Sequence, residues 1–446
     1  MKKLVVLGGG ISGYGSAILA RRKGFDVFLS DSGRIADRYR MKLEAWGVPY
    51  EEGGHSEERI LAASECVKSP GIPDSAPIVR KLRERGVPVI SEIEFAGRYL
   101  DGARTICITG SNGKTTTTSL VYRILRDAGC NVALGGNIGE SFAYSVATGD
   151  YDWYVLELSS FQLMTMQTSP HIAVTTNLAP NHLDVHKDYQ EYVDAKANIF
   201  THQNTGDIAV FNADNDDTVR QAAKAVGEVR WFSRKQRVEN GVFCENGVIY
   251  EAVNGAVTPI METKDVLLPG VHNIENYMAA FAAVRGMVSY ETMRNIARTF
   301  GGVEHRIELI RTRKGVRWYN DSIASSPSRT IAGLNSFPEQ VILIAGGKDK
   351  GISYAPLGPV VNDHVKLLLL CGKTAGVIRE AVEQSENYHG LEILDVADYH
   401  EAVAIADERS QPGDVVILSP ASTSFDRFAN FMERGQVFKA IVNELK

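Results

Sequence analysis

The chain has 446 residues, of which 44% are hydrophobic, and a formal net charge of −6 at pH 7. This length is enough for roughly two to four domains, each with its own core. The acidic balance argues against nonspecific nucleic-acid binding, so nucleic acid is not an expected partner. No apolar run approaches the roughly 18–20 residues that cross a bilayer, and we expect no membrane association.

The N-terminal apolar run breaks at once into glycines, unlike the apolar part of a signal peptide. The five cysteines are scattered and form no Cys-x-x-Cys pair, which is typical of reduced thiols in a core. We therefore expect a cytoplasmic protein, and we expect it to act as a monomer.

Short apolar strands alternate with amphipathic helices almost throughout, which predicts an α/β fold built on parallel sheets. We expect three domains: a Rossmann-like N-terminal domain over residues 1–93, a P-loop ATPase-like central domain with a parallel sheet over 94–299, and a Rossmann-like C-terminal domain over 300–446. The elements expected in the first domain are strands at Lys3–Leu7, Val27–Ser30, Glu65–Lys68 and Val87–Ile90, and a helix over Ile78–Arg85.

The central domain shows the same alternation, followed by two Asn-Gly pairs that are typical of hairpin turns. Its expected elements are strands at Arg104–Ile108, Trp153–Leu158, His171–Asn177 and Ile208–Phe211, hairpins within Gly241–Pro259, and a helix over Asn273–Met287. The strands expected in the third domain are Val316–Tyr319, Val341–Ala345, Lys366–Leu370 and Val415–Ser419.

The first strand runs into a Gly-x-Gly-x-x-Gly pattern at Gly8, Gly10 and Gly13, and Asp31 follows the second strand. This is the dinucleotide fingerprint, in which the acid bonds a ribose hydroxyl. A glycine turn beside a helix N-terminus holds any nucleotide diphosphate, however, so the pattern does not specify NAD. The glycines can also serve only strand–helix packing, and both interpretations stay open.

The most informative stretch begins at Ile108, where an apolar strand runs into a glycine loop, a lysine and several hydroxyls. Such a loop brings backbone N–H groups to phosphate oxygens, its lysine adds a point charge, and its first hydroxyl is placed for Mg²⁺. Its glycines are closer together than in the common P-loop. The residues expected to bind the nucleotide are Gly110, Ser111, Asn112, Gly113, Lys114, Thr115 and Thr116.

Two acidic or imidazole side chains follow later strands of the same domain. Glu157 ends the strand from Trp153, where a second Mg²⁺ ligand belongs in a phosphate-binding domain. His182 lies in a polar loop after another strand, which favours a site over a purely structural role. We expect both at one sheet edge.

Three further positions are ambiguous from the residues alone. Lys196 lies in a helical stretch, where a solvated lysine is the simpler interpretation. Asn273 and Asn276 face the same side of one helix. Their amides suit either a purine edge or the capping of the helix N-terminus. Neither interpretation is favoured.

Four polar loops follow a glycine pair or a strand in the third domain. They are Glu304–Arg306, Asn320–Ser322, Gly346–Gly351 and Ser419–Asp426. Each by itself fits turn chemistry, whereas four together indicate a binding crevice at the carboxyl edge of an open sheet.

Taken in order, these motifs resemble the Mur ligase family of ATP-dependent enzymes that form amide bonds, over essentially the whole chain. The family pattern Thr-Gly-x-x-Gly-Lys-Thr matches Thr109–Thr115, which explains the short glycine spacing. The resemblance continues through Gly136–Gly139, Glu157–Gln162, Asn181–Asp184, Lys196 and His272–Asn276. The N-terminal glycines and the ending Ser-Pro-Ala-Ser-Thr-Ser-Phe-Asp resemble most the members that join D-glutamate to UDP-N-acetylmuramoyl-L-alanine.

The resemblance implies that the first domain holds the UDP substrate. The residues implied around uracil and its ribose are Ile11, Ser12, Asp31 and Ser32, and those near the diphosphate and sugar are Gly71, Asn137 and Ser159. It also implies catalytic roles for Lys114, His182 and Lys196, and two Mg²⁺ sites. The implied metal ligands are Thr115 and Glu157 at one site, and His182 and Lys196, the latter as a carbamate, at the other.

The remaining implied contacts concern ATP and D-glutamate. Asn276, Arg306 and Asp321 are implied to contact ATP, with His305 near the nucleotide. The residues implied at the D-glutamate site are Ser325, Lys350, Ser424, Phe425 and Phe431.

Two features of the third domain depart from the family pattern or leave a choice. Ile323 stands where many members carry a lysine, so amino-acid binding must rest on other groups. Lys348 and Lys350 both flank Asp349, and the pattern does not decide between them.

Three other functions are weighed against this one. A Mur ligase for a different amino acid shares most of the motifs. An NAD-dependent oxidoreductase fits the first glycine pattern but leaves Lys114 and Glu157 unexplained. A nucleotide-dependent switch would retain the phosphate loop without ligase chemistry.

Overall fold

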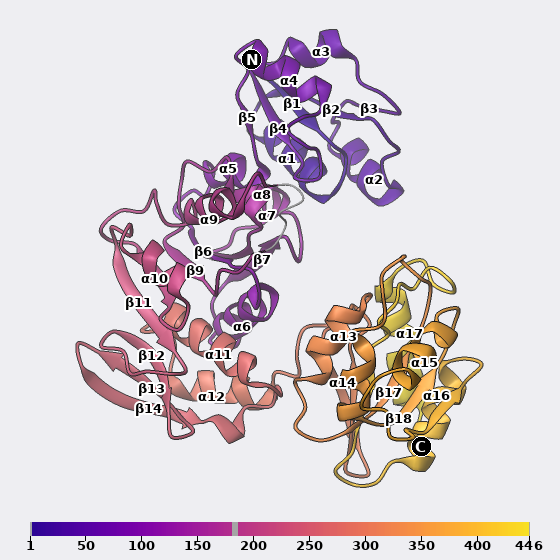
Figure 1. The fold of residues 1–446 in the computed structure, drawn as a ribbon. Coiled ribbons are helices and arrows are strands. Elements are labelled where there is room, and N and C mark those ends of the chain that lie inside the picture. Colours follow the sequence, from indigo (N-terminus) through magenta and orange to yellow (C-terminus); the bar gives the residue numbers. More distant parts are fainter. Residues whose placement is uncertain (1, 181–185, 446) are drawn as a thin grey trace. The chain divides into compact units, whose positions relative to one another are not determined.

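A computed structural model describes residues 2–180 and 186–445 of the chain (Figure 1). The described residues form two compact units. The first unit takes in the chain through Asp265 together with Ile274–Arg298, and the second takes in Val266–Asn273 together with the chain from Thr299 onward. The first unit carries two sheets and the second carries one. The fold therefore has three α/β parts, each built on its own sheet, as expected. None of the described helices has both the length and the apolar character needed to cross a membrane.

The N-terminal sheet is entirely parallel, with the strand order β3-β2-β1-β4-β5. Its central strand β1 buries four of its five residues because helices cover both faces. The strands are β1 Lys3–Leu7, β2 Asp26–Asp31, β3 Tyr50–Glu52, β4 Glu65–Lys68 and β5 Val89–Ile90. The helices are α1 Ile11–Arg22, α2 Asp37–Ala45, α3 Glu57–Leu61, α4 Pro77–Glu84 and α5 Glu92–Gly97.

The central sheet has the order β14-β13-β12-β11-β10-β9-β6-β8-β7 in the described part of the chain. Pairing is parallel from β7 to β12 and antiparallel from β12 to β14. The strands are β6 Arg104–Thr109, β7 Val132–Gly136, β8 Trp153–Glu157, β9 Ile172–Thr175, β10 Ile208–Asn212, β11 Glu228–Ser233, β12 Gly241–Glu245, β13 Val248–Val253 and β14 Ala256–Glu262. The helices are α6 Lys114–Asp127, α7 Phe142–Thr148, α8 Ser160–Leu163, α9 Tyr189–Ala197, α10 Asp216–Ala222, α11 Val271–Val284 and α12 Tyr290–Thr299.

The C-terminal sheet has the order β15-β16-β20-β17-β18-β19, and only β15 runs antiparallel to its neighbour. Apolar cores lie on both faces, one around Tyr319 and one around Trp318. The strands are β15 Glu308–Arg313, β16 Val316–Asn320, β17 Val341–Ala345, β18 Val365–Leu370, β19 Ile393–Asp395 and β20 Val415–Leu418. The helices are α13 Pro327–Leu334, α14 Leu357–His364, α15 Ala375–Glu383, α16 Tyr399–Arg409 and α17 Phe431–Glu444.

The expected strands are confirmed within a few residues at each end. The two Asn-Gly turns are also confirmed, because Asn246 and Asn254 adopt φ values of +49° and +50° and are each followed by a left-handed glycine. Helix α11 begins at Val271, two residues before the expected start, so Asn273 lies inside the helix rather than at its cap. The expected end of a strand at Asn177 is wrong by two residues, because β9 stops at Thr175 and the chain then turns toward the glycine loop.

Gly13 tests how tightly the first glycine pattern is packed. A Cβ atom at Gly13 would lie 1.7 Å from the carbonyl oxygen of Gly8, whereas a Cβ at Gly10 would meet no atom within 4 Å. We predict that Gly13→Ala lowers the free energy of unfolding by about 1–3 kcal/mol, as overpacking does, measured by urea denaturation. The matched Gly10→Ala variant should change it by less than about 0.5 kcal/mol. Equal stability of the two variants would contradict this packing.

Candidate functional site

The glycine loop after β6 is confined by its neighbours as well as by its own backbone. Gly110 has φ +143°, and a Cβ there would lie 1.9 Å from Oγ1 of Thr176. Gly113 has φ +79°, and a Cβ there would lie 2.3 Å from Oδ1 of Asn276 on α11. Only glycine satisfies both the left-handed backbone and the close approach at these positions.

The residues that follow β9 hold this loop from one side. The N–H of Ser111 donates to the carbonyl of Asn177 at 2.8 Å, and the Thr176 hydroxyl donates to the carbonyl of Asn112 at 2.6 Å. The Ser111 hydroxyl donates to the carbonyl of Ala179 at 2.9 Å and is buried. The side chain and the backbone N–H of Ser111 therefore both brace the loop.

Helix α6 begins directly after the loop with no side-chain cap on Gly113. The N–H groups of its first turn and the positive end of its dipole are therefore directed at the loop. The Lys114 ammonium donates to the carbonyls of Gly110 and Ser111 at 2.8 and 3.0 Å, so it lies over the same loop. Thr115 follows in the first turn and is half-buried. Loop, helix end, lysine and hydroxyl together suit the phosphates of a nucleotide.

Glu157 lies at the carboxyl end of β8, next to β6 in the sheet, and its side chain is 2% exposed. The Asn137 amide donates to its Oε1 at 2.9 Å, which orients the carboxylate. Its Oε2 is buried and has no hydrogen-bond partner among the described residues. A buried carboxylate oxygen is costly without a partner, so this atom fits a bound cation.

Lys196 on α9 is buried and donates to the hydroxyl of Thr109, at the end of β6, at 3.1 Å. Burial lowers the pKa of its amine to about 7; the Lys114 cation acts in the same direction and Glu157 in the opposite one. The interpretation of Lys196 as a solvated helix lysine is therefore wrong. The lysine lies where the phosphate loop and the Glu157 carboxylate both act on its charge.

His182 lies outside the described residues. Within the described ranges, 2–180 and 186–445, no three His, Cys, Asp or Glu side chains converge on a possible metal position. Of the expected metal ligands that the structure describes, Thr115 and Lys196 are not His, Cys, Asp or Glu. Glu157 is the one described ligand that belongs to these four residue types.

Two side chains near the loop were missed by the sequence analysis. The Tyr192 hydroxyl lies 2.9 Å from that of Ser111, which ties α9 to the glycine loop. His186 is buried, with Nε2 2.9 Å from the hydroxyl of Ser160 and its ring stacked on Phe161 at 5.3 Å. Their contacts join segments that are distant in sequence, and no local motif predicts such contacts.

The two asparagines of α11 have different surroundings. The Thr117 hydroxyl lies 3.4 Å from Oδ1 of Asn276, next to Gly113, so Asn276 borders the phosphate loop. The amide of Asn273 donates to the carbonyl of Pro269 at 2.6 Å, which is a local structural role. Asn276 is therefore the one of the pair that the fold places beside the nucleotide loop.

At the N-terminal sheet, Asp31 closes the glycine turn. Its Oδ2 accepts from the N–H of Gly9 at 2.6 Å, and its Oδ1 accepts from the N–H of Gly33 at 2.7 Å. Each carboxylate oxygen thus accepts one backbone N–H and keeps a second lone pair with which it can accept from a ligand hydroxyl. Of the other residues expected around the UDP substrate, Ser12 lies in the first turn of α1, Ile11 is 37% exposed, and Ser32 and Gly71 are exposed. Ser159 caps α8 in the central domain.

In the second unit, Arg306 and Asp321 lie on loops bounding β15 and β16. Asp321 is buried; its Oδ2 accepts from the Ser419 hydroxyl at 2.8 Å. Burial raises the pKa of this carboxyl to about 7, while that hydrogen bond and the Arg306 cation oppose the shift. His305 has φ +65°, and its Nδ1 lies 2.9 Å from the amide nitrogen of Asn320.

The residues expected at the amino-acid site come from several loops of this unit. Ser424 is buried and Phe425 is 63% exposed, and the Phe431 ring meets the His305 ring edge-on at 6.0 Å. Lys350 is exposed, and so is Lys348, whose backbone pairs with that of Thr423. Ser325 is half-buried in the loop before α13.

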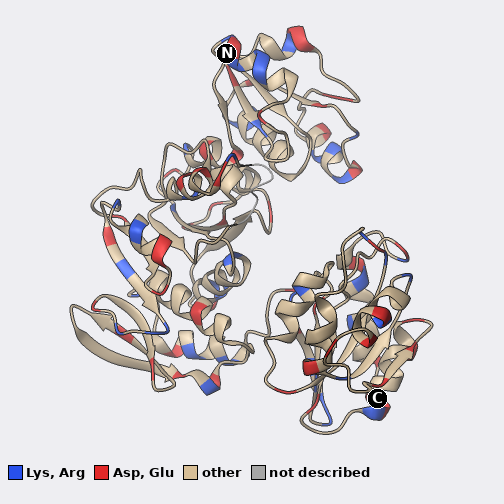
Figure 2. Cartoon of the chain, in the orientation of Figure 1, with Lys and Arg blue, Asp and Glu red and all other residues tan. Residues whose placement is uncertain are grey.

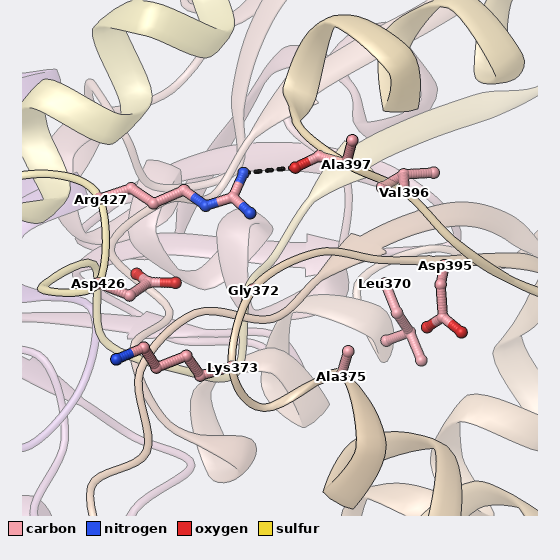
Figure 3. A pocket seen from close by; sticks show the side chains of 9 residues that line it. All are labelled: Leu370, Gly372, Lys373, Ala375, Asp395, Val396, Ala397, Asp426 and Arg427. Carbon is pink, nitrogen blue, oxygen red and sulfur yellow. Dashed lines mark hydrogen bonds between the residues drawn. The ribbon is translucent and has the colours of Figure 1, made fainter.

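A pocket of about 450 Å³ opens at the carboxyl ends of β18 and β19, beside the loop that carries Ser424 (Figure 3). Lys373 and Arg427 supply its cations, and Arg427 donates to the carbonyl of Ala397 at 2.6 Å. Sequence analysis did not single out either residue. Elsewhere, Lys and Arg are interspersed with Asp and Glu rather than gathered on one element (Figure 2).

The parallel sheets with glycine loops at strand ends, the lysine over the loop and the buried glutamate on the neighbouring strand define a nucleotide-binding α/β protein of the P-loop class. Family models match almost the whole chain. The MurD-like N-terminal domain of Mur ligases matches residues 2–91, the Mur ligase middle domain 108–284, and the glutamate ligase domain of Mur ligases 305–422. The chain belongs to the Mur ligase family.

Relatives are similar over the full length. A UDP-N-acetylmuramoylalanine–D-glutamate ligase from Acetivibrio thermocellus is 45% identical over 100% of this chain and 97% of its own. One of the same name from Ruminiclostridium cellulolyticum is 44% identical with the same coverage. The crystal structure of UDP-N-acetylmuramate-alanine ligase from Thermotoga maritima shares the fold, with a TM-score of 0.62, 18% identity and full coverage of both chains.

Gly113 tests the phosphate loop. Gly113→Ala would force a Cβ toward Asn276 and place alanine at a positive φ, so we predict that the Kd for ATP rises by about tenfold or more, measured by calorimetry. The matched control is Gly129→Ala, because Gly129 also has a positive φ but open space around its Cβ position. That variant should bind ATP as the wild type does. Unchanged ATP binding in Gly113→Ala would refute this loop geometry.

Proposed function

We propose that the protein is an ATP-dependent ligase that joins D-glutamate to UDP-N-acetylmuramoyl-L-alanine, releasing ADP and phosphate. Two features found together carry the proposal. Lys114 lies over the glycine loop, and the buried Oε2 of Glu157 has no hydrogen-bond partner among the described residues. The full-length relatives at 44–45% identity bear the name of this activity, which supports the same substrates.

The chemistry has to convert a carboxylate, a poor electrophile, into a reactive acyl group. The terminal carboxylate of the UDP substrate attacks the γ-phosphorus of ATP, ADP leaves, and an acyl phosphate forms. The neutral amine of D-glutamate then attacks the acyl carbon, and phosphate leaves with the former carboxylate oxygen. The first step brings two anions together, so cations must offset their repulsion. Lys114, which lies over the glycine loop, and the α6 N-terminus would supply part of that positive charge.

Magnesium supplies further charge compensation and orients the phosphates when it is bound. Thr115 and Glu157 would hold one ion, since they offer a hydroxyl and a free buried carboxylate oxygen. His182 and Lys196 would hold the second. An ammonium cannot bind a cation, so Lys196 would first have to become a carbamate, which also replaces the repulsion between Lys196 and Lys114 by attraction.

The three sheets would divide the substrates between them. The turn at Gly8–Gly13, with Ile11, Ser12, Asp31 and Ser32, would hold the uridine end. Gly71, Asn137 and Ser159 would place the diphosphate and sugar. Asn276, Arg306 and Asp321 would contact ATP. Ser325, Lys350, Ser424, Phe425 and Phe431 would hold D-glutamate, with Lys350 favoured over Lys348 because the Lys348 backbone is paired to Thr423.

We also propose that the enzyme works in the cytoplasm, as a monomer, on soluble substrates. An oxidoreductase is disfavoured because it would leave Lys114 over the glycine loop and the buried Glu157 carboxylate without a role. A ligase for another amino acid is the alternative that shares the same phosphate site.

An amino-acid panel tests the proposal. With UDP-N-acetylmuramoyl-L-alanine and Mg·ATP present, we predict that ADP release in a coupled assay requires D-glutamate and that L-glutamate and L-alanine support less than about 1% of that rate, a discrimination of at least ~2.7 kcal/mol. Mass spectrometry should find the corresponding amide product. Turnover with a different amino acid alone would overturn the D-glutamate assignment while leaving the ligase class intact.

Lys196 gives a second test. We predict that Lys196→Ala lowers kcat by at least about a hundredfold (~2.7 kcal/mol), because the second cation loses its ligand. The control is Lys224→Ala, since Lys224 is 52% exposed and lies two residues beyond the end of α10. That variant should keep wild-type turnover. Native mass spectrometry of the wild type should show an adduct of about 44 Da that Lys196→Ala lacks. Full activity of Lys196→Ala would contradict the proposed metal site.

A further inference from the structure

A buried acid that none of the roles above uses lies where the N-terminal and central sheets of the first unit meet. Glu92 begins α5 and is 2% exposed. Its Oε1 accepts from the Ser141 hydroxyl at 2.5 Å and from the N–H of Ala143 at 3.0 Å. Burial raises the pKa of the Glu92 carboxyl, while the Ser12 and Ser141 hydroxyls act in the opposite direction.

The hydrogen-bond partners of Glu92 belong to α7 and its cap, and α1 packs against both α5 and α7, so the helices that start at the two proposed ligand loops meet beside α5. Ser12 lies in the first turn of α1, directly after the glycine turn of the N-terminal sheet. Ser141 caps α7, which follows the loop from Gly136 that contains Asn137. Asn137 in turn orients Glu157. Glu92 therefore lies on a helix that packs against both α1, which follows the turn that would hold the UDP end, and α7, which follows the loop that orients Glu157.

The surrounding packing leaves little freedom at this joint. A Cβ at Gly15 on α1 would lie 1.8 Å from the Ser141 hydroxyl oxygen, so α1 and α7 are in close contact. A second tie joins the same elements, because the Tyr14 hydroxyl donates to Glu140 and the Lys42 ammonium lies 3.1 Å from the Oε2 of Glu140. Helices α1, α5 and α7 thus form one packed unit with Glu92 at its centre.

We propose that Glu92 is a positioning residue that fixes the UDP-binding turn relative to the loop orienting Glu157, and so sets where the far end of the UDP substrate meets ATP. This inference rests on the proposed function. A substrate held at its UDP end in one domain and reacting at its carboxylate in the next depends on the spacing between them, and a small displacement of reacting groups is costly. Uridine alone would contact only the turn of the first domain and so would not depend on that spacing.

The experiment compares two buried acids on α5. Glu92→Ala should raise the Kd for UDP-N-acetylmuramoyl-L-alanine by about tenfold and lower kcat, with the Kd values for uridine and for ATP within about twofold of wild type, all binding measured by calorimetry. Glu94→Ala is the matched control, because Glu94 is 5% exposed and its Oε2 accepts from the N–H of Gln167 and the hydroxyl of Thr168, away from both loops. It should lower Tm as Glu92→Ala does, yet leave all three Kd values unchanged.

Glu92→Gln keeps an acceptor for Ser141 and Ala143 and should restore binding to within about threefold of wild type. If Glu92→Ala and Glu94→Ala alter only Tm, and to a similar extent, Glu92 is merely structural and the inference fails. The proposed function fails separately, if the wild type itself does not bind UDP-N-acetylmuramoyl-L-alanine.

Discussion

The close packing of the Gly110–Gly113 loop against Thr176 and Asn276 is the constraint on which the rest of the site depends. The loop has left-handed glycines at both ends and is braced by the chain that follows β9. These contacts are made by the protein's own atoms, which favours a loop preorganised for its ligand. Such preorganisation removes the cost of ordering the loop at the moment of reaction. Lys114, the α6 N-terminus and Glu157 acquire their roles from their positions around this loop.

Charge compensation is the second organising theme. Glu157 and Lys196 are both buried at the carboxyl edge of the central sheet, where unpaired charges are costly. One carries a carboxylate oxygen without a described partner, and the other an amine whose pKa is lowered to about 7 by burial and by Lys114. Bound metal ions and phosphates would supply the charges that compensate these buried groups.

Much of the fold follows from the sequence because its strands are short, fully buried apolar runs bounded by glycine and polar residues. The phosphate loop and Glu157 were predictable for the same reason: each directly follows such a strand. The antiparallel strand β15 was not predictable from the sequence, because its residues are mostly half-buried and show no apolar run. Nor were the contacts of Tyr192 with Ser111 and of Glu92 with Ser141, which join residues 81 and 49 positions apart. Local patterns carry no information about such pairs. The burial of Lys196 was invisible to helical periodicity and was indicated only by family resemblance.

The proposed ligase reaction depends most directly on an acyl phosphate intermediate. The fate of one carboxylate oxygen atom tests whether this intermediate forms. UDP-N-acetylmuramoyl-L-alanine labelled with ¹⁸O in its terminal carboxylate would be turned over with Mg·ATP and D-glutamate, and the released phosphate would be analysed by mass spectrometry. The account predicts one ¹⁸O atom in each phosphate, because the carboxylate oxygen that attacks phosphorus leaves with it. Phosphate without the label, formed at the same rate as the amide product, would contradict it.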